Sequence, residues 1–229
     1  MTSHQPLLDR EIEAQEIVEH RIPWFDYMPG ILLLIPMIGG FLLMFFDPDG
    51  MIDWAVSRSV LNAGRFENLQ LHMFAHGSIA HIVMNGLALF SVAAVVVNKL
   101  GSNFKAWLGL LILFEITGLS GAATFLVLHQ WNDVPMLGAS GAIYGLVAFL
   151  VRIPANKDDE IIPIWSTSMW NVVINIIKDH FWLLLMFGLP PLLLGKEGGL
   201  AWEAHLGGFI AGLFLTPYLM NKGSKFAKR

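Results

Sequence analysis

The stretch "NLQLHMFAHGSIAHIVMNGLALFSVAAVVVN", residues 68–98, contains no Asp, Glu, Lys or Arg. A helix of about 20 apolar residues crosses the hydrocarbon core of a bilayer, and this stretch is longer than that. Because the bilayer core holds no water to pair with free backbone groups, a spanning segment forms a helix rather than an open strand. The stretch therefore predicts a membrane-spanning helix, one that also carries three histidines and Asn85.

Five further stretches are free of charged residues, apart from Glu115 in the second of them. They cover residues 27–46, 106–132, 134–151, 180–195 and 204–221. The whole chain of 229 residues is 55% hydrophobic and 14% charged, whereas an ordinary soluble domain has about 45–50% apolar and about 25% charged residues. We therefore expect an all-α membrane protein with six transmembrane helices.

The basic residues are distributed unevenly between the two sides that six spans would define. One side, with both termini and the loops after the second and fourth spans, carries eleven of the 14 Lys and Arg residues. Bases gather on the cytoplasmic side of membrane proteins, so we expect both termini in the cytoplasm. The chain then divides into a short acidic cytoplasmic tail (1–26), a transmembrane domain (27–221) and a basic cytoplasmic tail (222–229).

Another uncharged run, residues 161–177, leaves two interpretations open. Its Ser, Thr and Asn content, with Asn171, Asn175 and Lys178 near helical spacing, favours an amphipathic helix lying in the membrane interface. A seventh span is the alternative, but it would move the C-terminal bases to the outer side. We therefore predict an interfacial helix.

Polar side chains inside a membrane usually face the helix bundle and mark function or interhelical contacts. His81 and Asn85 are four residues apart, which puts them on one face of a helix. His72 and His76 share this spacing, but "HMFAH" lacks the glutamate of the zinc motif H-E-x-x-H, and the chain has no cysteine. We therefore expect no metal site and no cofactor.

Two segments place a serine between glycines: "GLSGAATF", residues 118–125, and "GASGAIYG", residues 138–145. Ser120 falls inside the third span, where its hydroxyl can bond back to its own turn, so we predict a packing role for it. Ser140 opens the fourth span on the outer side. The sixth span, "AHLGGFIAG" at residues 204–212, begins with His205 on that same side.

This placement favours Ser140 as a nucleophile, because a serine hydroxyl needs a nearby base to take its proton and His205 can supply one. The free N–H groups of a helix start can stabilise an oxyanion, and His81 and Asn85 can add side-chain donors. Tyr144, four residues after Ser140, would pack beneath the His205 ring. An α/β-hydrolase elbow is excluded because G-x-S-x-G would require glycine where Ala142 stands.

The three motifs, "HMFAHGSIAHIVMN", "GASGAIYG" and "AHLGGFIAG", in this order resemble those of the rhomboid family of intramembrane serine proteases. The resemblance implies a six-helix rhomboid bundle that hydrolyses peptide bonds in or near transmembrane segments by a Ser–His dyad through an acyl-enzyme. It implies Ser140 as nucleophile and His205 as base, with an oxyanion hole of His81, Asn85 and the Ser140 amide. The supporting residues that it implies are Tyr144, His76, Gly138, Gly141, Gly208 and Gly212.

The resemblance also implies the partners and the location: transmembrane segments of membrane-protein substrates, the lipid bilayer, and no nucleic acid or metal. We expect a multi-pass protein of the bacterial inner membrane whose active site opens to the outer side. The chain departs from the family at "ENLQ", residues 67–70, where a Trp-Arg pair is frequent, and at "VNKLG", residues 97–101, where an acid is frequent. We further predict that residues 181–195 form a mobile gate and residues 196–203 a cap over the site.

Two other classes of function compete with a protease. An inactive rhomboid-like protein would bind membrane partners, but it would typically lack the serine or the histidine. A transporter or channel would distribute ionisable groups through the full membrane depth and break its helices in two related halves, which this chain does not do. For Glu115, the remaining intramembrane acid, we predict a buried hydrogen-bonded group rather than a catalytic one.

Overall fold

A computed structural model describes residues 22–43, 46–47, 50–153, 161–183 and 201–224. Within these ranges the chain is helical, and its single β-type pairing is the isolated bridge between Val56 and Met136. The long helices are α2 (Trp24–Leu43), α6 (Ile79–Lys99), α7 (Phe104–Leu128), α8 (Ser140–Val151), α9 (Thr167–Leu183) and α11 (Trp202–Ser224). The short ones are α3 (Gly50–Asp53), α4 (Arg58–Asn62), α5 (Asn68–Leu71) and the 3₁₀ helix η1 (His72–Phe74). The predicted all-α class is confirmed.

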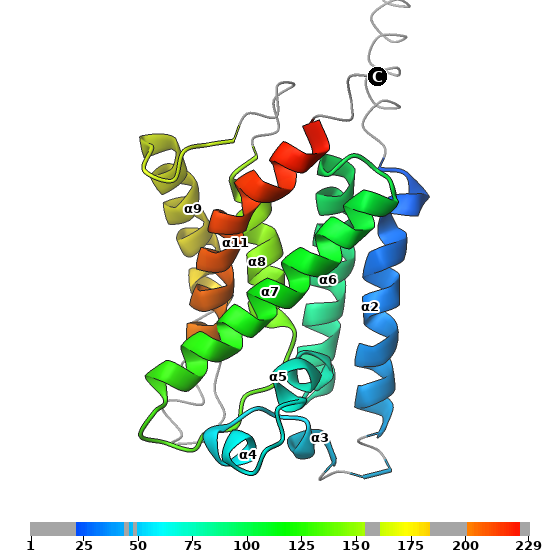
Figure 1. Cartoon of the computed structure of the whole chain (residues 1–229), viewed down its shortest axis with the longest axis vertical. Helices are drawn as coiled ribbons and strands as arrows, with labels where there is room; N and C mark the ends of the chain where they lie inside the picture. The colour runs from blue at the N-terminus through cyan, green and yellow to red at the C-terminus, as the bar shows by residue number, and fades with distance from the viewer. Residues whose placement is uncertain (1–21, 44–45, 48–49, 154–160, 184–200, 225–229) are drawn as a thin grey trace, which may run out of the picture.

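The long helices run lengthwise through the bundle, and successive ones alternate in direction (Figure 1). By length and composition α2, α6 and α7 are able to cross a membrane, and α8 is a shorter apolar helix. The start of α2 and the end of α11 lie at one end of the molecule, as an even number of crossings requires (Figure 1). The six spans and the cytoplasmic termini remain predictions, and most of the predicted gate and cap, residues 184–200, lies outside the described residues.

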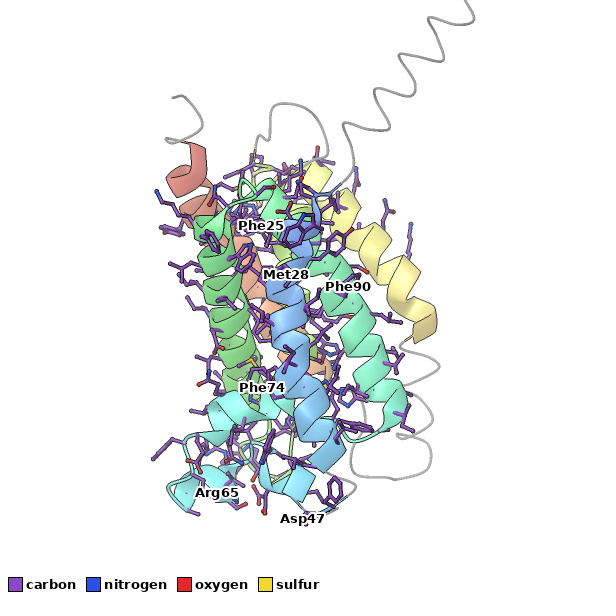
Figure 2. The ribbon with its side chains drawn as sticks, turned by 90° about the vertical axis from the view of Figure 1, so that its right-hand side faces the viewer. Phe25, Met28, Asp47, Arg65, Phe74 and Phe90 are labelled. Atoms are coloured by element: carbon purple, nitrogen blue, oxygen red, sulfur yellow. The ribbon has the colours of Figure 1, made fainter. Side chains whose placement is uncertain are left out.

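The region predicted as an interfacial helix differs from that expectation. Residues 161–166 form a turn, and α9 begins at Thr167 and continues to Leu183, past the predicted end at residue 177. It runs along the bundle rather than across its end (Figures 1 and 2). The reason is packing, because the buried Met169 contacts Ala148 of α8 and Leu213 of α11.

The second predicted span is helical over less of its length than expected. Residues 68–74 form α5 and η1, and α6 begins only at Ile79. Ser78 causes this break: its backbone is extended, and its hydroxyl accepts a hydrogen bond from the N–H of His81 (3.1 Å). Such a cap satisfies one of the unpaired donors of a helix start, so the sequence "HGS" ends one structure and begins the next.

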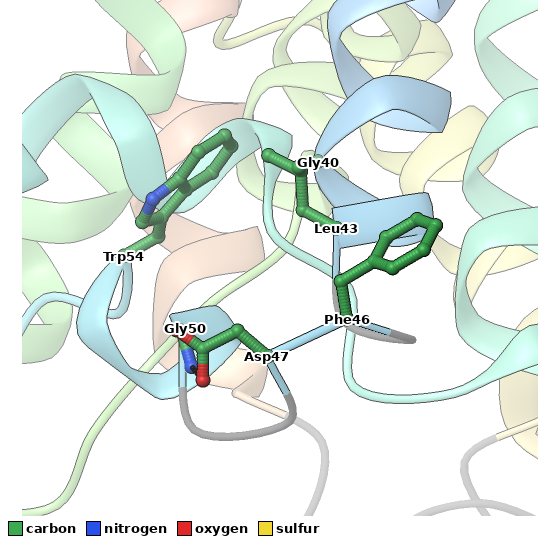
Figure 3. Close-up of a pocket in the computed structure, with 6 residues that line it drawn as sticks. All are labelled: Gly40, Leu43, Phe46, Asp47, Gly50 and Trp54. Atoms are coloured by element: carbon green, nitrogen blue, oxygen red, sulfur yellow. Dashed lines mark hydrogen bonds between the residues drawn. The ribbon is translucent and has the colours of Figure 1, made fainter.

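The part of the first loop between residues 50 and 75 is folded rather than extended. The buried Asn68 side chain donates from Nδ2 to the carbonyl oxygens of Asp53 and Ala55, both at 2.6 Å. Figure 2 shows Asp47 and Arg65 at the end of the molecule opposite Phe25. A cavity of about 180 Å³ lies in this loop, lined by Gly40, Leu43, Phe46, Asp47, Gly50 and Trp54 (Figure 3).

The core lies between α6, α7 and α8, with α2 packed against α6. Large apolar side chains such as Leu110, Phe114, Leu146 and Phe149 are fully buried there. In a bilayer, apolar side chains gain little from leaving lipid, so close packing between helices supplies much of the stability. Close packing between α8 and α11 positions the candidate site.

Candidate active site

Ser140 and His205 lie within hydrogen-bond distance of each other. Ser140 is the first residue of α8, and its Oγ is 2.7 Å from Nε2 of His205, which is in the first turn of α11. Only 8% of His205 is exposed. With Nε2 unprotonated, the serine hydroxyl donates to it, which is the arrangement that a nucleophile and its general base require.

Glycines allow this approach, because α8 and α11 touch backbone to backbone. A Cβ added to Gly208 would collide with the carbonyl of Gly141, and one added to Gly212 would collide with the carbonyl of Gly145. Small residues at such spacing let membrane helices pack closely. The contact therefore depends on missing side chains, and it brings the first turns of both helices together.

Tyr144 lies against the candidate base. Its ring is nearly parallel to that of His205, with centroids 4.3 Å apart and an angle of 10°. The spacing of four residues puts Tyr144 one turn after Ser140 on α8. Stacking restricts the rotation of the imidazole, so the phenol ring favours the orientation in which Nε2 faces the serine.

The beginning of α8 leaves backbone donors open. Its first helical hydrogen bond runs from the N–H of Ile143 to the carbonyl of Ala139 (3.0 Å). The N–H groups of Ser140, Gly141 and Ala142 precede it, so they have no partner within the helix. Such groups carry the partial positive charge of a helix start and are suited to bind an oxyanion.

Gly138 brings the donors of α6 to this helix start. Its φ of +117° is a backbone conformation that favours glycine, and its N–H donates to the carbonyl of His72 (2.7 Å). A Cβ at Gly138 would lie 2.6 Å from Nε2 of His81 and 3.5 Å from Nδ2 of Asn85. Both side chains therefore lie against the residue that is two positions before Ser140.

A chain of hydrogen bonds fixes Asn85. Its Nδ2 donates to Nε2 of the fully buried His76 (3.0 Å). Because an amide nitrogen only donates, His76 must carry its proton on Nδ1, and Nδ1 donates to the carbonyl of Phe74 (3.3 Å). The second amide proton of Asn85 takes no part in these two hydrogen bonds. The ring of His76 also lies edge to face with that of His81, at 4.9 Å.

The other polar residues singled out in the sequence lie in structural contacts. Ser120 donates from Oγ to the carbonyl of Ile116 (2.7 Å), the bond to its own turn that was predicted. Glu115 accepts a hydrogen bond from Nε2 of Gln70 (3.2 Å) as predicted, but it is half-buried rather than buried. Nδ1 of His72 donates to the carbonyl of Asn68 (3.2 Å). None of these contacts involves Ser140 or His205.

Two contributions to the site were missed in the sequence. Gly145 contacts Gly212, and the signal was present, because Gly141 and Gly145 have the same four-residue spacing as Gly208 and Gly212. Nε2 of His129, at the end of α7, lies 3.7 Å from Oε1 of Glu203, so this pair joins the end of α7 to the first turn of α11. Nothing in the sequence pairs these two residues.

In the part of the chain that the structure describes, no three His, Asp or Glu side chains gather in a way that could hold a metal ion. The chain offers no Cys ligand at all. The cavity of Figure 3 is also separate from Ser140 and His205, since only residues of α2, its C-terminal extension and the first loop line it.

Comparison with known proteins gives several relatives of modest identity. "Rhomboid protease GluP" of Bacillus subtilis (strain 168) is 28% identical over 176 residues, which cover 76% of this chain and 30% of that protein. "Uncharacterized protein Rv1337" of Mycobacterium tuberculosis (strain ATCC 25618 / H37Rv) is 25% identical over 67% of this chain and 58% of its own length. "RHOMBOID-like protein 5" of Arabidopsis thaliana is 24% identical over 72% and 48%.

The chain thus spans between 30% and 58% of the length of these relatives. The model of the rhomboid domain matches residues 63–222 and so covers α5 to α11, including every residue of the candidate site. This match extends over more than half of the chain. Together with the apolar helices long enough to cross a bilayer, it shows that the chain is an integral membrane protein of the rhomboid family.

Proposed function

We propose that the chain is an intramembrane serine endopeptidase that cleaves transmembrane segments of membrane proteins by a Ser–His dyad. The observation that carries this proposal is the 2.7 Å separation between Ser140 Oγ and His205 Nε2 at the first residue of α8. The relative from Bacillus subtilis, whose name describes a rhomboid protease, supports the same reaction class.

In the first half-reaction, His205 Nε2 takes the proton of the Ser140 hydroxyl while Oγ attacks the carbonyl carbon of the substrate. Negative charge develops on the carbonyl oxygen, and the N–H of Ser140 with the side chains of His81 and Asn85 stabilises it. When the intermediate collapses, the C–N bond breaks and His205 gives its proton to the leaving amine. The acyl group then remains on Ser140.

In the second half-reaction, a water molecule loses a proton to His205 and attacks the acyl carbon. The ester bond to Oγ breaks, and the proton returns from His205 to the serine. No carboxylate is needed to orient the histidine in this scheme, because the Tyr144 ring restricts it from one side. Gly138, Gly141, Gly208 and Gly212 support the dyad by allowing close approach, and His76 supports it by orienting Asn85.

The proposal includes a location and a substrate class. Six spans with both termini in the cytoplasm would open the site to the outer side, because Ser140 and His205 lie in the first turns of helices that run toward the cytoplasmic end. The relatives from Bacillus and Mycobacterium support a bacterial inner membrane. Substrates would be transmembrane segments that unwind near the cleavage site, with no nucleic acid or metal partner.

Reaction with a fluorophosphonate probe tests the dyad without a known substrate. The probe would be added to the purified wild type in detergent and to three variants, Ser140→Ala, His205→Ala and Ser120→Ala. We expect labelling of the wild type and of Ser120→Ala, and none in the other two. If the wild type fails to react while a known rhomboid protease reacts under the same conditions, the dyad is unformed or inactive. That result would favour the alternative, an inactive rhomboid-like protein that binds membrane partners.

A further inference from the structure

Arg152, directly after α8, has an unusual set of partners. Only 6% of the residue is exposed, and its guanidinium reaches the carbonyl of Leu213 in α11 from Nη1 (2.7 Å). Its Nε donates to the carbonyl of Ile162 (3.0 Å). Within the described part of the chain, no carboxylate forms an ion pair with this buried charge. Its donors are directed at backbone carbonyls instead.

The carbonyl of Leu213 is open because of Pro217. In a regular helix this carbonyl would accept a hydrogen bond from the N–H four residues later, but that residue is Pro217, which has no N–H. A carbonyl without a donor inside a membrane protein is unfavourable, since no water replaces the lost bond. Arg152 therefore supplies from α8 the donor that α11 lacks.

The same arginine also holds the segment that leads into α9. The N–H of Ile162 donates to the carbonyl of Arg152 (2.8 Å), while Nε of Arg152 donates back to the carbonyl of Ile162. Through one residue the end of α8 is thus bonded to α11 and to the turn before α9.

The rest of the α8–α11 contact resists sliding poorly. Between the dyad and Arg152, glycine faces backbone at Gly141 and Gly208 and again at Gly145 and Gly212. The side chains that approach these glycines from the other helix are short: Ala148 lies against Gly212, and Ala204 lies against Gly141. A hydrogen bond, in contrast, is directional and weakens steeply when its geometry is disturbed. The bond from Arg152 to Leu213 is therefore a directional contact that opposes movement of α11 along α8.

We propose that Arg152 is a positioning residue: by bonding the carbonyl that Pro217 leaves open, it sets the register of α11 against α8 and so holds His205 beside Ser140. This inference rests on the proposed function. A slide of one residue moves a helix about 1.5 Å along its axis, enough to separate Nε2 from Oγ. Arg152 acts at a distance, because about 18 Å of α8 separates it from Ser140.

The test compares Arg152→Met, Arg152→Lys, Pro217→Ala and the double variant Arg152→Met with Pro217→Ala. Methionine keeps much of the buried stem but removes the donors, and lysine keeps a single donor group. Alanine at position 217 restores the N–H that Leu213 needs. Arg58→Met is the matched control, because Arg58 also donates to a backbone carbonyl, that of Leu126, but at an exposed site. Fluorophosphonate labelling rates and thermal unfolding midpoints are measured for each in the same detergent.

We expect Arg152→Met to slow labelling by about 10- to 100-fold at temperatures where it is fully folded, since a misplacement of about 1 Å can cost that much. Arg152→Lys should fall between it and the wild type. Pro217→Ala alone should stay within about twofold of the wild type, and adding it to Arg152→Met should recover most of the lost rate, because the carbonyl no longer needs the arginine. Arg58→Met should label like the wild type.

Two results would overturn the positioning role. One is an Arg152→Met protein that melts earlier but labels at the wild-type rate while folded, which would show a purely stabilising residue. The other is a rate loss that Pro217→Ala leaves unchanged. Failure of the proposed function is distinguished by the wild type, which would then not label at all. In that case the unfolding midpoints still test the contact. If the shifts for Arg152→Met and Pro217→Ala simply add in the double variant, Arg152 does not compensate for Pro217.

Discussion

The two serine–glycine segments have nearly the same sequence and opposite surroundings. Both read Gly-x-Ser-Gly-Ala, at residues 118–122 and 138–142. Ser120 lies in the interior of the α7 sequence, away from both helix ends, and its hydroxyl donates to the carbonyl of Ile116 in the same helix. Ser140 begins α8, and its hydroxyl meets His205 from another helix. A serine between glycines is therefore not a functional signal by itself.

The difference arises from what precedes each serine. Gly118 continues a helix, and a Cβ there would meet the flexible end of the Met73 side chain. Gly138 ends an extended segment at a positive φ, and a Cβ there would meet the imidazole of His81. Because the chain turns sharply at Gly138, a new helix starts at Ser140 with unpaired N–H groups, and α6 lies against this helix start. The comparison predicts that, outside the dyad, changes at the turn formed by Gly138 affect the reactivity of Ser140 most.

Among changes outside the dyad, the largest effect is expected from Gly138→Ala. The methyl group would require a strained backbone and would displace His81, so the donors around Ser140 would be lost together. We expect labelling by a fluorophosphonate to fall by more than about a thousandfold, since a single oxyanion donor already contributes about 10²–10³. Labelling rates of the folded protein, checked by circular dichroism, measure this.

Gly64→Ala is the matched control for that change. Gly64 also has a positive φ, of +83°, but nothing lies within 4 Å of its missing Cβ. It should therefore show the cost of backbone strain alone, about 1–3 kcal/mol of stability, with an unchanged labelling rate. Equal losses of labelling in both variants would mean that Gly138 matters only for folding.

The next effect is expected at Asn85, which distinguishes the surroundings of Ser140 from those of Ser120. Asn85→Ala removes one donor near the helix start and leaves the buried His76 without its hydrogen-bond donor. We expect labelling about 100-fold slower and a free energy of unfolding lower by about 1–3 kcal/mol. Labelling and chemical denaturation measure the two effects separately.

Asn98→Ala serves as the control for Asn85→Ala. Asn98 lies on the same helix, but its side chain bonds Asp26 at the opposite end (3.0 Å). It should lower stability without changing the labelling rate. A slower rate in Asn98→Ala as well would show that α6 acts through its overall stability rather than through a donor at the site.

The parts of the site that sequence predicted are those with short-range spacing. His81 and Asn85 share a helix face because they are four residues apart, and Tyr144 reaches His205 because it is one turn from Ser140. Composition was sufficient for the all-α class, since a bilayer permits few alternatives.

The parts that sequence did not predict depend on contacts between distant segments. The start of α6 at Ile79 rather than near residue 68 depends on the Ser78 cap, a local signal that a continuous uncharged run concealed. The lengthwise course of α9 depends on Met169 packing against α8 and α11. The bond from Arg152 to Leu213 joins residues 61 positions apart, and no periodicity encodes it.

A moderate effect is expected at Tyr144, which has no counterpart next to Ser120. Tyr144→Ala removes the ring stacked on His205 and frees the imidazole to rotate, so we expect labelling about tenfold slower. Tyr144→Phe keeps the ring and should stay within about twofold of the wild type. If phenylalanine is as slow as alanine, the hydroxyl rather than the stacking is the important part.

The smallest effect is expected from Ser120→Ala, which tests whether the second serine of the comparison has only a packing role. The hydroxyl of Ser120 donates only to a carbonyl that already belongs to the helical ladder of α7, and a bond of this kind adds little or slightly bends the helix. Alanine is smaller and a better helix former, so unfolding should change by less than about 0.5 kcal/mol and labelling by less than twofold. The backbone next to Gly207 stays as it is, because that contact uses the carbonyl of Ser120 and not its side chain. A large loss of labelling would mean that Ser120 influences Ser140 through α11, which packs against both α7 and α8. The distinction between a packing serine and a reactive one would then no longer hold.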